Sequence, residues 1–171
     1  MFRRDGEAIL DIARPDPFPF CEISPMSSPD TSPYGLLALR AALGTMWIAH
    51  GLLKLMVFGV AGFSGFLGSL GLPTVLAVPI IAAEIGGGFL ILLGIYGRQV
   101  SLLLIPVMVG ALMVHLPNGW LFSAPKGGWE YPAFLIVASI AHALSGDGAL
   151  ALRSAPLAFW RPAGTAQPRL A

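Results

Sequence analysis

The sequence has few charged residues for its length. Of its 171 residues only 11% are charged, whereas 56% are hydrophobic. A soluble domain of this size carries about a quarter charged residues. Beyond residue 34 the chain has only three acidic residues, Glu84, Glu130 and Asp147. This shortage excludes an ordinary soluble globule and indicates a protein whose outer surface faces lipid.

Cysteines, basic clusters and cofactor motifs are also scarce. Cys21 is the one cysteine, which excludes a disulfide framework and a CxxC redox or metal motif. The formal net charge is +1 and there is no run of Lys or Arg, which excludes a nucleic-acid partner. The sequence also has no GxSxG nucleophile elbow, no HxxxH spacing, no haem ligand pair and no flavin fingerprint. We therefore predict neither a hydrolase nor a metal site.

Four apolar runs have lengths that suit membrane-crossing helices. They cover residues 34–58, 73–95, 99–116 and 129–144. About 20 helical residues cross the hydrocarbon core of a bilayer, so the fourth run is short. The second and third runs are separated by a brief turn, which makes them an antiparallel hairpin. The pattern predicts an all-α membrane protein, a four-transmembrane-helix antiparallel bundle over residues 33–152.

Glycine and proline mark the predicted helix ends. Ser32 and Pro33 are suited to the N-cap and first position of the first helix, and Gly97 to the stop after the second. Between the first two runs, glycine recurs at every third position from Gly59 to Gly71. We expect a short interfacial or re-entrant helix there, with its glycine face packed on the bundle. A flexible apolar loop is the alternative.

The segments outside the apolar part are predicted to be tails. Residues 1–32 are polar and interrupted by proline, which predicts a disordered cytoplasmic tail, and residues 153–171 form a second cytoplasmic tail. With both tails and the 97–98 turn on one side, that side holds eight arginines and the other side two lysines, Lys54 and Lys126. Because basic residues stay inside, we expect a multi-pass membrane protein with cytoplasmic termini.

Ionisable side chains within the apolar runs are the first functional candidates. Glu84 lies near the middle of the second run, and His50 and Lys54 lie four residues apart in the first, on one helical face. Each bare charge in hydrocarbon costs at least about 2.5–3.5 kcal/mol, so we expect these groups to pair. We predict that Glu84, Lys54 and His50 are catalytic or proton-handling residues. A buried pair that only fixes helix register is the alternative.

Further polar and aromatic groups stand at the same side of the bundle. His115 ends the third run and Glu130 begins the fourth, so five ionisable groups are expected to converge on one outward-facing pocket. A metal held by these groups is disfavoured because Lys54 would repel a cation. We predict five ligand-binding residues: Trp47, His115, Trp120, Trp129 and Glu130.

A second polar set lies at the opposite side. Arg98 and Asp147 stand at helix ends and are predicted to form a structural ion pair. Arg40 and His142 complete the set, which we interpret as orientation and capping residues.

The stretch from Tyr34 to Leu152 resembles the DoxX family of small bacterial and archaeal membrane proteins. The resemblance is carried by RAALGTMWIAHGLLKL, a glycine-rich stretch ending in LGLP, AAEIGGGFLILLGIYGR and GWEYPAFLIVASIAHALSGDGALAL. It implies a four-helix membrane bundle that acts as a subunit of a quinone-linked or other redox assembly. It also implies the bacterial plasma (inner) membrane as the location. Because the chain has no redox motif of its own, either quinone as a cofactor or a partner oxidoreductase subunit would have to hold the electrons.

Two other functions remain open. A small metabolite or proton transporter would use Pro79 and Pro106 to break its helices and the glycine-rich stretch as a gate, and it would act as a homo-oligomer. A purely structural or assembly subunit would have no chemistry. Whether the chain is an enzyme is therefore undecided, and any enzymatic role would be that of an oxidoreductase subunit.

Overall fold

The computed structural model describes residues 29–155, and these fold into helices. The elements, in chain order, are α1 (Ser32–Leu52), a π-helix (Leu53–Phe58), α2 (Gly59–Ser69), a 3-10 turn (Thr74–Leu76), α3 (Ala77–Leu93), α4 (Gly97–His115), a 3-10 turn (Leu116–Asn118) and α5 (Glu130–Ser145). Within residues 29–155 the extended structure is one isolated bridge between Ile95 and Arg153. The predicted all-α class is confirmed, as is a short helix, α2, between the first two long ones.

Three helical stretches are long and apolar enough to cross a membrane. They are Ser32–Ser69, Thr74–Leu93 and Gly97–Asn118. The α5 helix is apolar but has only 16 residues, a rise of about 24 Å. The chain is thus a multi-span membrane protein, and a fourth crossing through α5 stays a prediction.

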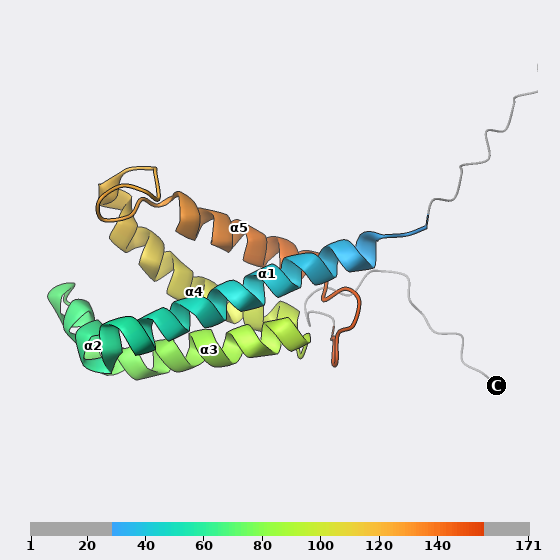
Figure 1. The fold of residues 1–171 in the computed structure, drawn as a ribbon, viewed down its shortest axis with the longest axis horizontal. Coiled ribbons are helices and arrows are strands. Elements are labelled where there is room, and N and C mark those ends of the chain that lie inside the picture. The colour runs from blue at the N-terminus through green and yellow to red at the C-terminus, as the bar shows by residue number, and fades with distance from the viewer. Residues whose placement is uncertain (1–28, 156–171) are drawn as a thin grey trace, which may run out of the picture.

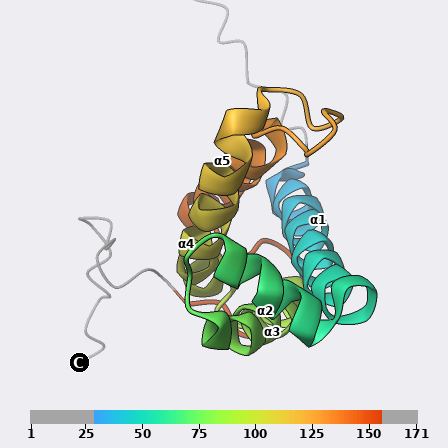
Figure 2. The same cartoon turned by 90° about the vertical axis from the view of Figure 1, so that its left-hand side faces the viewer.

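The long helices form two pairs, α1 with α3 and α4 with α5, joined through the turn between α3 and α4 (Figure 1). The start of α1, the α3–α4 turn and residues 146–155 lie together at one end, here called the terminal end. The α2 helix and the α4–α5 connection lie at the other, the loop end, which faces the viewer in Figure 2.

Glycines allow α1 and α3 to touch along their backbones. A Cβ built on Gly44 would lie 2.8 Å from the carbonyl oxygen of Gly88, and one on Gly51 would lie 2.5 Å from a side-chain carbon of Ile85. Small residues are what permits such close packing between membrane helices. The tight glycine contact is therefore between α1 and α3.

Most of the expected glycine face of α2 is not packed; the exception is Gly68, where a Cβ would lie 3.2 Å from a side-chain carbon of Thr74. A Cβ on Gly65 would meet no atom within 4 Å, and one on Gly62 would meet only a carbon 3.9 Å away. The α2 helix instead buries Phe63 and Leu67 against Ala77 and other residues of α3. This prediction was wrong because the large apolar side chains bury more area than the glycine stripe can.

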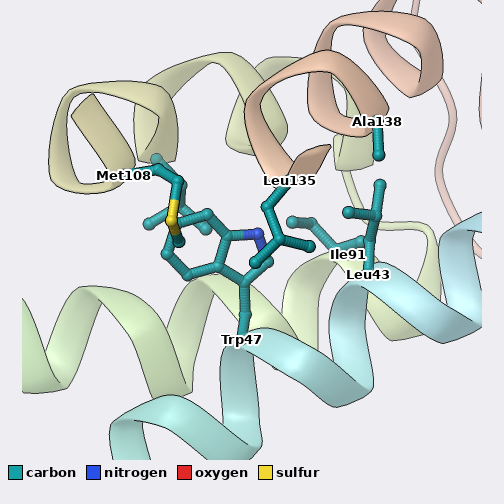
Figure 3. Close-up of a cluster of buried hydrophobic side chains, with 7 residues drawn as sticks. Leu43, Trp47, Ile91, Met108, Leu135 and Ala138 are labelled. Carbon is teal, nitrogen blue, oxygen red and sulfur yellow. The ribbon is translucent and has the colours of Figure 1, made fainter. Parts of the chain in front are cut away.

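The core of the bundle is apolar and has Trp47 at its centre (Figure 3). Trp47 is 1% exposed and packs with Leu43, Ile91, Leu104, Met108, Leu135 and Ala138. It was predicted as a ligand-binding residue of the outer pocket, but it lies inside this cluster. The core thus lies between the polar groups of the two ends.

The helix ends differ from the predicted ones by a few residues. The N-cap of α1 is Thr31, one residue before Ser32, and the Asp30 carboxylate accepts the Ser32 N–H at 3.0 Å. The last residue of α3 is Leu93, and the C-cap that stops the helix is Gly94, whose φ of +66° is left-handed. Gly97, which was predicted as this stop, instead begins α4. Pro79 lies in the first turn of α3, where proline is tolerated, and α4 continues through Pro106.

The C-terminal segment packs on the bundle as far as Ala155. Its backbone pairs with the α3–α4 turn, with the N–H of Arg153 donating to Gly94 at 3.0 Å and the N–H of Tyr96 donating to Arg153 at 2.9 Å. The Gln99 amide donates to the Ala155 carbonyl at 3.0 Å. The rest of the two predicted tails, residues 1–28 and 156–171, lies outside the described residues.

Candidate functional site

Lys54 and Glu84 form an ion pair at the loop end of the α1–α3 pair. The Lys54 ammonium donates to both carboxylate oxygens of Glu84, at 2.8 and 2.7 Å. The Glu84 side chain is 2% exposed and that of Lys54 is 19% exposed. The ammonium also lies 5.6 Å from the centre of the Phe63 ring, which favours the positive charge. The structure thus pairs the acid of α3 with the lysine that the sequence proposed for it.

Local backbone geometry places this pair. Lys54 lies in the π-helix Leu53–Phe58, a rare conformation that is frequent at functional sites. Gly51, one turn earlier, brings α3 close, since its Cβ would lie 3.2 Å from that of Glu84. The glycine therefore lets a carboxylate on one helix reach an ammonium on the next.

His50 points to a different neighbour. Its Nδ1 donates to the Met46 carbonyl at 2.8 Å, and its ring stacks on Tyr131 of α5 with centres 5.4 Å apart. Lys54 instead turns to α3. His50 and Lys54, four residues apart, therefore contact different helices, His50 the α5 helix and Lys54 the α3 helix.

His115 is the last residue of α4 and Glu130 the first of α5, so the two flank the α4–α5 connection. His115 Nδ1 is 3.1 Å from the Gly127 carbonyl, and Glu130 accepts the Phe122 N–H at 2.9 Å. Among residues 29–155 no hydrogen bond or ion pair links either of them to Lys54 or Glu84. His115 and Glu130 thus bond to the backbone of the loop between them, and a pocket shared by all five ionisable groups stays a prediction.

The predicted aromatic residues line a separate groove. Trp120 and Trp129 meet edge to face with ring centres 4.5 Å apart. With Phe122, Glu130, Tyr131 and Phe134 they line a groove of about 550 Å³ along α5. The Tyr131 hydroxyl is buried and has no hydrogen-bond partner in the described part of the chain.

The predicted ion pair between Arg98 and Asp147 is absent from the described residues. Arg98 Nε instead donates to the Ala143 carbonyl at 2.7 Å, and its Nη2 to the Leu144 carbonyl at 3.2 Å. The last carbonyls of α5 have no partner within the helix and carry its negative dipole end, which draws the guanidinium away from Asp147. Arg98 is thus a helix cap, as its position suggested, with a different partner.

Asp147 belongs to a buried polar cluster that the sequence reading underrated. Its carboxylate accepts the Ser154 hydroxyl at 2.7 Å and lies 3.4 Å from His142 Nε2. Its backbone carbonyl accepts a 2.6 Å bond from Arg40 Nη1. Ser101 is 2.8 Å from His142 Nδ1. Arg40, His142 and Asp147 are each at most 2% exposed, so this cluster is far more buried than interfacial capping residues would be.

The glycines around this cluster are the feature of the sequence from which the cluster could have been predicted. A Cβ on Gly97 would collide with the Asp147 carboxylate, and one on Gly94 would lie 2.5 Å from Arg40 Nη1. Gly148, with φ +69°, turns the chain beside Asp147. Glycines thus occur in both segments that pack around the Asp147 carboxylate, as Gly94-x-x-Gly97 in the α3–α4 turn and as Gly146-Asp147-Gly148 after α5. Within residues 29–155 no group of three His, Cys, Asp or Glu is placed to hold a metal ion.

Comparisons with known proteins agree with this architecture. The DoxX family model matches residues 35–116, which include Lys54, Glu84 and Arg98. A Bacillus subtilis (strain 168) protein named "Putative oxidoreductase CatD" is 36% identical over 119 residues, 69% of this chain and 84% of that protein. An "Uncharacterized protein" of Haemophilus influenzae (strain ATCC 51907 / DSM 11121 / KW20 / Rd) is 33% identical over 122 residues, 70% of this chain and 89% of that protein. No solved structure matches significantly. The chain belongs to the DoxX family.

Proposed function

We propose that this protein is the membrane subunit of a quinone-linked redox assembly, and that Lys54 and Glu84, with His50 one turn away, form its proton-handling and head-group-binding site. The observation that carries this is the bidentate ion pair of a 2%-exposed carboxylate inside an apolar helix pair. The name of the Bacillus relative supports a redox setting. Electrons would come from a partner oxidoreductase subunit.

The chemistry follows from the donor count of the ammonium. Lys54 has three N–H donors, and Glu84 takes two of them. The remaining donor can bind an acceptor oxygen, such as a quinone carbonyl, that reaches the partly exposed lysine. A proton passed from Nζ to the carboxylate leaves two neutral groups, which a medium of low dielectric tolerates. The pair can therefore hold a proton for a quinone that takes up two electrons and two protons.

The charges at the two ends suit cytoplasmic termini and a plasma-membrane location. Among the described residues, Arg98 and Arg153 lie at the terminal end, and Lys54 and Lys126 belong to the loop end. Basic residues favour the cytoplasmic side, so the Lys54–Glu84 pair would face the outer half of the membrane. This orientation makes α5 the fourth crossing.

Transport receives less support than this redox function. The α3 and α4 helices run through Pro79 and Pro106 without a break, so the two helix breaks that a transporter was expected to have at these prolines are missing. The apolar cluster around Trp47 also stands between the polar groups of the two ends. A structural subunit without chemistry remains the competing outcome of the test below.

The test compares Lys54→Met, Glu84→Gln and the double variant in cells that lack the native copy. Each single change leaves a buried group without its partner and is expected to weaken folding, whereas the double change removes both charges and restores it. The measurement is the quinol-to-quinone ratio extracted from membranes while electron donor is supplied. Lys126→Met, at an exposed loop lysine, is the matched control.

We expect the folded double variant to give the quinol-to-quinone ratio of cells without the protein, and Lys126→Met to give the wild-type ratio. A double variant that folds and keeps the wild-type ratio would show that the pair is only structural. A wild-type ratio equal to that of cells without the protein would contradict the redox function itself.

A further inference from the structure

The groove beside α5 is a built site at the loop end. Its two sides are held together by backbone hydrogen bonds, with the Trp129 N–H donating to Gly119 and the Glu130 N–H donating to Trp120, both at 3.1 Å. Gly128 is buried between them, and a Cβ there would collide with the carbonyl oxygens of Trp120 and Leu121. The connection is thus folded so that the two tryptophans and the glutamate stand side by side.

The head of the groove is an aromatic corner with one negative charge. Trp120 and Trp129 are nearly perpendicular, at 87°, and Phe122 and Tyr131 add further rings. Glu130 uses Oε1 to accept the Phe122 N–H, and no bond to its second oxygen occurs in the described chain. No lysine, arginine or histidine lines the groove. Aromatic faces and a carboxylate together attract an organic ammonium group and disfavour an anionic one.

The rest of the groove faces the lipid. Glu130, Phe134 and Val137 line it at spacings of four and three, which is one face of α5. Phe134 is 66% exposed and Val137 is 65% exposed on this apolar helix. A ligand with an apolar chain can therefore enter sideways from the bilayer and lie along α5 with its head at the corner.

We propose that this groove binds a lipid of the surrounding leaflet that carries an ammonium head, with the ammonium between Trp120, Trp129 and Glu130 and one acyl chain along Phe134 and Val137. Ethanolamine lipids have this head, whereas glycerol-headed phospholipids offer only negative charge. The site is separate from Lys54–Glu84, and its test does not depend on redox activity.

Tryptophan fluorescence of the full-length protein tests the proposal directly. Trp160 is replaced by Phe, so that the remaining tryptophans are Trp47 and the two of the groove. The protein is then placed in two kinds of vesicle made of unlabelled lipid. One contains a small fraction of phosphatidylethanolamine with brominated acyl chains, and the other the same fraction of brominated phosphatidylglycerol. Bromine quenches nearby tryptophans, and the buried Trp47 contributes the same background in both mixtures. We expect quenching by the ethanolamine lipid to exceed quenching by the glycerol lipid, with an apparent preference of about two- to fivefold.

Variants separate the groove from general lipid contact. Glu130→Gln is expected to abolish the preference while leaving folding intact, and Trp120→Leu is expected to lower it. Asp30→Asn, at an exposed acid before α1, is the matched control and keeps the preference. Equal quenching by both lipids, stronger quenching by the glycerol lipid, or an unchanged preference in folded Glu130→Gln would overturn the proposal.

Discussion

Arg40 donates a 2.6 Å hydrogen bond to the backbone carbonyl of Asp147, 107 residues further along the chain. The bond joins the first turns of α1 to the segment that follows α5. It places a guanidinium where only 1% of the residue is exposed. Arg40 also lies against Gly94, so a single side chain holds three parts of the terminal end together.

Removal of this side chain should destabilise the bundle. Arg40→Met leaves the buried Asp147 carbonyl without its charged donor, which costs about 1–3 kcal/mol. Unfolding in detergent with increasing SDS measures the loss. The control Arg153→Met changes an exposed arginine and should cost less than about 1 kcal/mol. Equal stability of the two variants would contradict the role assigned to Arg40.

The two glycines of α4 offer a matched comparison. Gly97→Ala drives a methyl group into the Asp147 carboxylate and should cost about 1–3 kcal/mol. Gly110→Ala meets no atom within 4 Å and should stabilise α4 by about 0.5–1 kcal/mol, because alanine favours the helix. Thermal unfolding of both variants in the same detergent checks the opposite signs. A neutral Gly97→Ala would mean that the C-terminal segment does not sit against α4.

Neighbouring glycines of α3 test the contact between α1 and α3. Gly88→Ala would bring a methyl group 2.8 Å from the backbone nitrogen of Ile48, so the helices must separate. We expect a loss of about 1–3 kcal/mol and a weaker Lys54–Glu84 bond one to two turns away. Gly86→Ala faces open space and should be neutral or slightly stabilising. Unfolding midpoints and a cysteine cross-link between α1 and α3 are the measurements.

The start of α1 should respond to pH. The hydrogen bonds from Ser32 lower the pKa of the Asp30 carboxyl below its ordinary value of 3.8. A lowered pKa in the folded state stabilises this helix end at pH values above 3.8, and the stabilisation is lost as pH falls through the folded value. The amide-exchange protection factor of the first turn, which is corrected for the intrinsic pH dependence of exchange, should therefore fall in acid, whereas Asp30→Asn should show no such change. Equal acid responses of the two proteins would contradict the capping role.

Much of the fold could be predicted because the thickness of the bilayer fixes the length of an apolar helix that crosses it. Apolar runs punctuated by Gly and Pro placed each long helix within a few residues of its observed ends. The shift from Gly97 to Gly94 as the stop of α3 arose because both glycines are needed, one for its left-handed φ and one for the approach of Asp147. Sequence spacing alone does not distinguish these two uses.

The site was harder to predict because it depends on contacts between helices. Pairing of Lys54 with Glu84 followed from the cost of bare charges in hydrocarbon. That His50 stacks on Tyr131 of α5 and does not join the pair could not be predicted, because the sequence does not give the position of α5 relative to α1. Arg98 could have paired with the Asp147 carboxylate or with the carbonyls at the end of α5. The sequence does not distinguish these two partners, and the packing of α4 against α5 selects the carbonyls.

The bond between Arg40 and Asp147 also sets an order of assembly. During synthesis α1 enters the bilayer long before residue 147 is made. Until then the Arg40 guanidinium has no partner there and must stay in water or at the lipid interface. Only when the last helix and its trailing segment arrive can the guanidinium be withdrawn from solvent. The terminal end therefore packs only after the membrane helices have been inserted. A chain truncated before residue 147 would lack the partner of Arg40 and leave that end unpacked.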